Sequence, residues 1–69
     1  MIVRARVALP LDDLRRATVE LRGDLRMQIA VTRINQVPDW TTLVVTGPTQ
    51  RVGRYGRTWF DWSATVETH

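Results

Sequence analysis

The sequence predicts an α+β fold: a small β-α-β-β-β domain in which one helix packs on one face of a mostly antiparallel, four-stranded sheet. Residues 2–9 and 59–68 alternate between apolar and polar side chains, as half-buried strands do. Residues 11–22 instead repeat their apolar side chains at three- and four-residue spacing, as an amphipathic helix does. We expect residues 1–69 to form a single domain, because the chain is long enough for only one. A domain this small buries only about 60% of the surface that its unfolded chain exposes.

The first strand, residues 2–9, is predicted to end at Pro10, which has no N–H to donate to a sheet. Proline is also favoured at a helix start, and Asp12 and Asp13 follow where carboxylates stabilise a helix N-terminus. Gly23 is expected to end this helix, because glycine readily adopts the left-handed conformation of a C-terminal cap.

A second interpretation of the same region replaces the helix with a hairpin. From Val19 to Val31 every second residue is apolar or glycine, so a turn at residues 22–24 would place all of them on one face of two strands. Both interpretations make residues 25–34 a strand. The proline, the acid pair and the glycine favour the helix, because independent local signals then agree.

The rest of the sheet is predicted from short β-branched or alternating segments. Residues 35–40 contain Pro38 and are expected to connect two strands. Residues 41–46 (TTLVVT) form the third predicted strand, and residues 59–68 form the fourth. One helix covers only one face of this sheet, so the other face is open. The polar residues expected on that open face are Arg4, Arg6, Arg26, Gln28, Thr32, Asp61 and Thr65.

Most side chains that enzymes use are missing. The chain has no Cys and no Lys, which excludes a thiolate nucleophile, a Cys-ligated zinc, a Schiff base and a P-loop lysine. His69 is the single histidine and stands at the C-terminal end, where chains fray. We therefore expect a protein that is not an enzyme and that binds no metal and no cofactor.

Apolar runs in the sequence are short, far below the roughly 20 residues that cross a bilayer. No secretion signal follows Met1, and the absence of cysteine suits a reducing compartment. We expect a cytoplasmic protein with no membrane contact. All ten basic residues are arginine, which indicates a GC-rich coding genome such as that of an actinobacterium or one of its phages.

An arginine-rich segment, residues 47–58 (GPTQRVGRYGRT), is the strongest functional signal. It is longer than a hairpin turn needs. Gly47 and Pro48 are predicted to begin a turn, and Gly53 and Gly56 to adopt left-handed angles that free the arginines. Arginines beside an aromatic ring are suited to follow phosphates while the ring stacks on a base. The sequence therefore predicts a small, basic, non-catalytic module that contacts nucleic acid. The predicted contacts are Arg51, Arg54, Tyr55 and Arg57, with Arg4, Arg6 and Arg26 as a second basic strip.

Two alternatives remain open for this segment. It is either a solvated hairpin loop whose arginines only discourage edge pairing, or part of a protein-interaction factor. Such a factor, for example a phage-encoded inhibitor or adaptor, would form a homodimer and bind a partner protein through a sheet edge. Trp40 and Trp59 are the predicted partner-binding residues, because indoles are enriched at interfaces. Trp62 is expected in the core.

Overall fold

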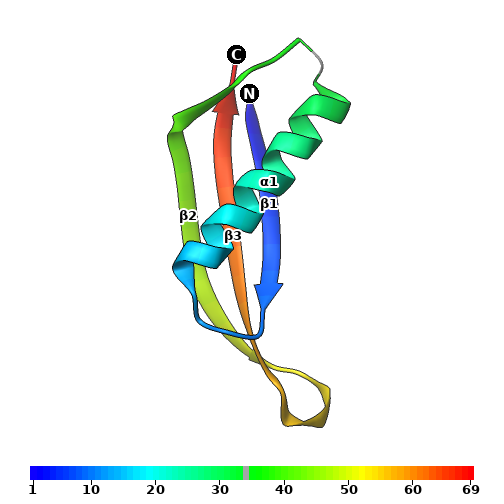
Figure 1. Cartoon of the computed structure of the whole chain (residues 1–69), viewed down its shortest axis with the longest axis vertical. Helices are drawn as coiled ribbons and strands as arrows, with labels where there is room; N and C mark the ends of the chain where they lie inside the picture. The colour runs from blue at the N-terminus through cyan, green and yellow to red at the C-terminus, as the bar shows by residue number, and fades with distance from the viewer. Residues whose placement is uncertain (34) are drawn as a thin grey trace.

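The protein is a three-stranded antiparallel sheet with one helix across one face. The computed structural model describes residues 1–33 and 35–69. Its elements, in chain order, are β1 (Ile2–Leu9), α1 (Leu14–Thr32), β2 (Pro38–Val52), the short 3₁₀ turn η1 (Arg54–Gly56) and β3 (Thr58–Thr68). The sheet order is β1-β3-β2, and β3 is antiparallel to both neighbours. Figure 1 shows α1 crossing the sheet diagonally.

The α+β class and the single helix agree with the prediction, but the four-stranded β-α-β-β-β order is wrong. The error lies in residues 25–34, which continue α1 instead of forming a strand. Leu25 and Ile29 are buried, whereas Met27 and Val31 are 67% and 71% exposed. A half-buried strand would have buried all four, so the fold uses the four-residue period of the run and not its alternation. Residue 34 lies outside the described residues.

Gly23 does not end the helix, and the alternative hairpin at residues 22–24 is also wrong. Gly23 lies in the middle of α1, and a Cβ built on it would meet no atom within 4 Å. A mid-helix glycine costs about 1 kcal/mol relative to alanine, while each leucine-sized side chain buried gains about 1.5–3 kcal/mol. Burial of Leu25 and Ile29 against the sheet therefore outweighs the glycine.

The helix begins at Leu14, three residues after the predicted start at residue 11, so Pro10 and Asp12 lie outside it. Asp13 is the N-cap residue, and its Oδ1 accepts a hydrogen bond from the Arg16 backbone N–H at 3.1 Å. This bond satisfies one of the donors that a helix start leaves free. At the other end, the Arg33 N–H donates to the Ile29 carbonyl oxygen at 2.9 Å.

The core fills the space between α1 and the sheet. Ala5 of β1 lies opposite Ala64 of β3 in the register, and two such small side chains at the middle of the sheet leave room for the helix. Trp62 is 4% exposed, which confirms its predicted place in the core. The buried apolar residues are Val3, Ala5, Leu9, Ala17, Leu21, Leu25, Ile29, Trp62, Ala64 and Val66.

Strand β2 is much longer than the predicted residues 41–46. Its pairing with β3 is irregular between Asp39 and Val44 and again between Thr46 and Thr49. At the second irregularity Gly47 has a φ of 127°, and a Cβ there would lie 2.9 Å from the Asp61 carbonyl oxygen. Gly47 and the proline after it therefore form a bulge within the strand and do not begin the predicted turn.

Candidate nucleic-acid interface

The arginine-rich segment belongs to a two-stranded arm. Strand β1 ends at Leu9, which pairs with Phe60 of β3, so beyond that point β3 pairs only with β2. Figure 1 shows the hairpin extending past α1 and past the end of β1. We call residues 49–61 the hairpin arm. Arg51 pairs with Trp59 and Val52 with Thr58, so most of the segment is a paired ribbon and not a loop longer than a hairpin turn, as the sequence had indicated.

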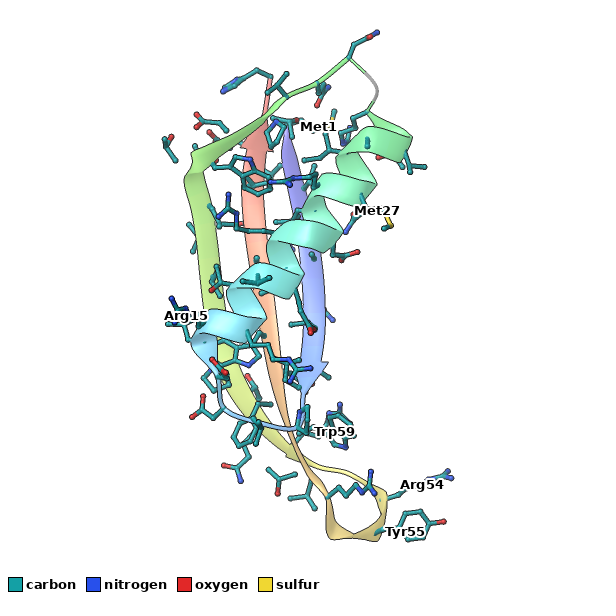
Figure 2. The ribbon with its side chains drawn as sticks, in the orientation of Figure 1. Met1, Arg15, Met27, Arg54, Tyr55 and Trp59 are labelled. Atoms are coloured by element: carbon teal, nitrogen blue, oxygen red, sulfur yellow. The ribbon has the colours of Figure 1, made fainter. Side chains whose placement is uncertain are left out.

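The tip of the hairpin arm is a tight turn that holds a tyrosine in the solvent. Tyr55 has a φ of 63° and Gly56 a φ of 73°, and positive φ at two successive residues is what a type I′ turn requires. The Arg57 N–H donates to the Arg54 carbonyl oxygen at 3.5 Å. Tyr55 is 97% exposed, and Figure 2 shows its ring pointing away from the rest of the chain.

The two glycines of the tip have different roles. Gly56 adopts the predicted left-handed conformation, but Gly53 has a φ of −88° and does not. A Cβ on Gly53 would lie 3.1 Å from both Cδ1 and Nε1 of Trp59. Gly53 therefore gives the Trp59 indole room to lie against the backbone at the tip of the ribbon.

Arg51 is engaged within the hairpin arm. Its Nε donates to Asp61 Oδ2 at 2.9 Å and its Nη2 donates to Asp61 Oδ1 at 3.2 Å. Hydrogen bonding from Arg51 lowers the pKa of Asp61 below its ordinary value, and the same contact raises the pKa of Arg51. A two-point pair between arginine and carboxylate leaves little net charge. Arg51 is thus not free for phosphate in the way that the sequence alone suggested.

Arg54 and Arg57 flank Tyr55 and are both exposed. Within residues 1–33 and 35–69, neither of them forms an ion pair. The tip therefore carries two uncompensated guanidinium groups on either side of an exposed ring. Of the predicted arginine contacts in this segment, Arg54 and Arg57 are the two that are exposed and form no ion pair within the described residues.

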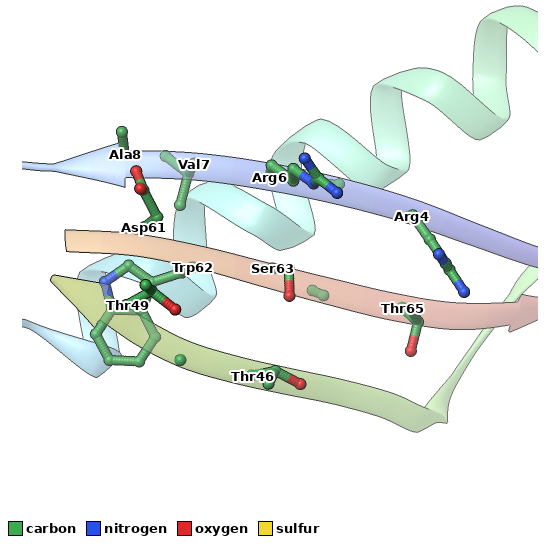
Figure 3. A pocket seen from close by; sticks show the side chains of 13 residues that line it. Arg4, Arg6, Val7, Ala8, Thr46, Thr49, Asp61, Trp62, Ser63 and Thr65 are labelled. Carbon is green, nitrogen blue, oxygen red and sulfur yellow. The ribbon is translucent and has the colours of Figure 1, made fainter. Parts of the chain in front are cut away.

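A second basic surface lies on the face of the sheet that α1 leaves open. Arg4 and Arg6 of β1 pair with Thr65 and Ser63 of β3. Figure 3 shows these side chains on the side of the sheet away from the helix. They line a shallow hollow of about 640 Å³ that also includes Thr46, Thr49 and Asp61. We call Arg4, Arg6, Thr46, Ser63 and Thr65 the open-face strip.

Arg26 is not part of the open-face strip. Because residues 25–34 are helical, Arg26 lies on α1, on the other side of the sheet. Its guanidinium carbon is 5.8 Å from the centre of the Trp40 ring, and that of Arg22 is 4.9 Å from the same ring. Gln28 and Thr32, also expected on the open face, lie on the helix as well.

The sequence matches no protein-family model, and it has no significant match among curated proteins or solved structures.

The surfaces that the protein-interaction hypothesis requires, namely the two tryptophans and the sheet edges, are less accessible than expected. Trp40 and Trp59 are both partly buried; Trp40 lies beneath two arginines and Trp59 lies against Gly53. The sheet edges are also protected. Gln28 Nε2 donates to the Arg4 carbonyl oxygen of edge strand β1 at 3.0 Å, and edge strand β2 contains Pro38 and Pro48. Prolines on an edge strand hinder the addition of another strand.

His69 is held in place and not frayed. Its backbone exchanges two hydrogen bonds with Val37, at 2.8 and 3.0 Å. Its Nε2 lies 3.4 Å from Asp39 Oδ2. Hydrogen bonds from Thr41 and then from His69 lower the pKa of the Asp39 carboxyl group. This pair lies at the end of β2 opposite to the hairpin arm, as the register of β2 and β3 requires.

Two further observations concern the part of the chain that the structure describes. Its one helix is not apolar enough to cross a membrane. The same residues contain no group of three His, Asp or Glu side chains placed to hold a metal ion.

Sequence reasoning missed three residues of the interface. Asp61 was placed on the open face but not recognised as the counterion of Arg51, because the two are diagonal neighbours only in the register of the hairpin, in which Thr49 pairs with Asp61 and Arg51 with Trp59. The hydroxyl groups of Thr46 and Ser63 were also overlooked. Ser63 could have been found, because it alternates with buried residues and shares a face with Asp61 and Thr65.

Proposed function

We propose that this chain is a small, non-catalytic nucleic-acid-binding module whose hairpin arm makes the main contact. The observation that carries the proposal is the tip, where Tyr55 is 97% exposed between two arginines that form no ion pair within residues 1–33 and 35–69. In this role Arg54 and Arg57 bind phosphates, and the Tyr55 ring stacks on an exposed base.

The backbone at the tip supports this role. A tyrosine with positive φ costs about 1–2 kcal/mol more than one in an ordinary conformation, and Tyr55 gains no burial that would offset this cost. Asparagine or glycine would be the usual choice in such a turn. Strain of this kind is concentrated at binding sites, and a base stacked on the ring would explain why a tyrosine is used.

The open-face strip extends the proposed contact along the sheet. The backbone of β3 between Thr58 and Thr65 spans about 23 Å at 3.3 Å per residue, which is long enough to follow several nucleotides. Arg4 and Arg6 supply the cations at the far end of this path, and Ser63 and Thr65 supply hydroxyl donors beside them. The strip is bounded by the acidic Glu67, which pairs with Ile2.

These groups set the salt dependence that is expected. Each phosphate contact on single-stranded nucleic acid contributes a slope of about 0.7 to the fall of log affinity with log salt concentration, and about 0.9 on B-DNA. Arg4, Arg6, Arg54 and Arg57 together would give a slope of about 2.8 on a single strand. We expect weak binding by one chain.

The test is fluorescence anisotropy of labelled single-stranded and duplex oligonucleotides of DNA and RNA, each titrated at several salt concentrations. The double substitution Arg54→Gln and Arg57→Gln should weaken binding and lower the slope by about 1.4 on single strands. The matched control is Arg15→Gln with Arg16→Gln, which changes the net charge equally but lies at the start of α1, away from both surfaces. Equal losses in the two double variants would show only non-specific attraction, and unchanged binding by the tip variant would refute the proposal.

A further inference from the structure

The outward face of helix α1 is apolar along its middle, although none of the elements that the structure describes covers it. Val19, Met27 and Val31 are 68%, 67% and 71% exposed. Gly23 and Ala30 lie between them on the same side, because residues four, seven or eight positions apart share a helix face. We call Val19, Gly23, Met27, Ala30 and Val31 the outer helix face.

Gly23 lies at the centre of this face, and no backbone angle or close contact among the described residues requires a glycine there. It lies inside a regular helix, it is not one of the glycines with positive φ, and the space above its Cα is open to at least 4 Å. Glycine is the poorest helix former after proline. A glycine in this position is explained where another backbone approaches closely. A shallow depression lined by Val19, Arg22, Gly23 and other residues of α1 lies there.

Charge is separated on the two sides of the outer helix face. Asp24 and Glu20 lie along one side, where Glu20 Oε1 accepts a hydrogen bond from Arg16 Nε of the same helix at 3.4 Å. Arg22 and Arg26 lie along the other side, with their guanidinium carbons 4.9 and 5.8 Å from the centre of the Trp40 ring. When two copies of such a helix pack in parallel about a two-fold axis, the acidic side of each meets the basic side of the other. In an antiparallel pair, arginines would face arginines.

We propose that the outer helix face binds the same face of a second copy of this chain, with the two α1 helices parallel and Gly23 against Gly23. The occupant is a second copy because the charge pattern complements itself in this arrangement. The helix has 19 residues and is about 28 Å long, so the contact is small and the dimer is concentration-dependent. Both hairpin arms then project from the same end of the dimer. The inference does not depend on the proposed nucleic-acid function.

Sedimentation equilibrium from about 10 μM to about 1 mM tests the association, since this range brackets a weak dimer. The wild-type protein should approach twice the monomer mass. Gly23→Gln adds bulk without apolar surface and should raise the dimer dissociation constant about tenfold or more, while the monomer unfolds at the same or a higher temperature. The control is Thr32→Gln, which adds similar bulk at an exposed helix position that points away from the outer helix face. A monomer throughout the range, or equal effects of the two substitutions, would overturn the proposal.

Single cysteines test the orientation, because the natural chain has none. In the parallel dimer, Val19→Cys and Ala30→Cys should each form a disulfide with its own copy under mild oxidation. Tyr55→Cys at the hairpin tip serves as the control for random collision. Cross-linking of the residue 19 variant to the residue 30 variant, without self-linking of either, would establish an antiparallel pair and refute the arrangement.

Discussion

Replacing Tyr55 with asparagine should separate the stability of the hairpin arm from its binding function. Tyr55 has a φ of 63° and a ψ of 22°, in the region that asparagine tolerates far better than an aromatic residue. The side chain is 97% exposed, so its removal opens no cavity. The substitution relieves backbone strain and removes only the ring.

The magnitudes follow from this geometry. A left-handed conformation costs a tyrosine about 1–2 kcal/mol, and asparagine should remove about half of this cost. The free energy of unfolding should therefore rise by about 0.5–1 kcal/mol. For a domain of this size, 1 kcal/mol raises the midpoint of thermal unfolding by about 4–8 °C. Loss of one base stacked on the ring should cost about 1–3 kcal/mol in binding, which weakens affinity for single strands about 5- to 150-fold.

Thermal unfolding followed by circular dichroism gives the first quantity, and anisotropy with a single-stranded oligonucleotide gives the second. Tyr55→Trp is the control, because it keeps an aromatic surface at the same strained position and should bind like the wild-type protein. Destabilisation by Tyr55→Asn would show that the tyrosine ring supports the fold. Unchanged affinity in a stable variant would show that the ring does not stack on a base.

Two other predictions test the helix and the ion pair. Leu25→Ala should lower the free energy of unfolding by about 2–5 kcal/mol, whereas Met27→Ala should change it by less than about 0.5 kcal/mol. Chemical denaturation measures both values. Similar losses in the two variants would contradict the assignment of residues 25–31 to a helix. Arg51 lowers the pKa of Asp61 in the folded protein below its ordinary value of 3.8. The ion pair therefore stabilises the fold at pH values above 3.8, and this stabilisation is lost as the pH falls through the lowered pKa of the folded state. Asp61→Asn should therefore weaken the acid dependence of unfolding, and by freeing Arg51 it should raise the salt slope of single-strand binding by about 0.7. An unchanged slope would show that Arg51 does not reach phosphate even when it is free.

Part of the candidate interface was visible in the sequence. Arg54, Tyr55 and Arg57 were singled out because their residue types and the nearby glycines pointed to an exposed, basic turn, and they lie at such a turn. Arg4 and Arg6 were placed on the open face by simple alternation, and they lie there. The engagement of Arg51 was not predicted, because its partner Asp61 is ten residues away and the two become neighbours only in the register of the hairpin, in which Arg51 pairs with Trp59 and Thr49 with Asp61.

The sequence by itself determined the segments whose local signals all agree. Strand β1 shows alternating side chains and ends before a proline. Strand β3 shows the same alternation from Phe60 to Glu67. The acid pair Asp12 and Asp13 marks the start of α1 to within three residues. Each of these signals acts within a few residues, so no information from the rest of the chain is needed.

Only the tertiary structure decided whether the run from Leu25 to Val31 forms a helix or a strand. Its apolar residues recur every two positions, as in a strand, and Leu25 and Ile29 are also four positions apart, as on one face of a helix. The physical reason is that a helix and a strand would bury different residues of this run. The free energies of the two conformations differ only when those residues can pack against the sheet. With β1 and β3 presenting one apolar face, a continued helix buries Leu21, Leu25 and Ile29 along a single line. Packing against the sheet therefore stabilises the helix over the strand, even though the helix then contains Gly23.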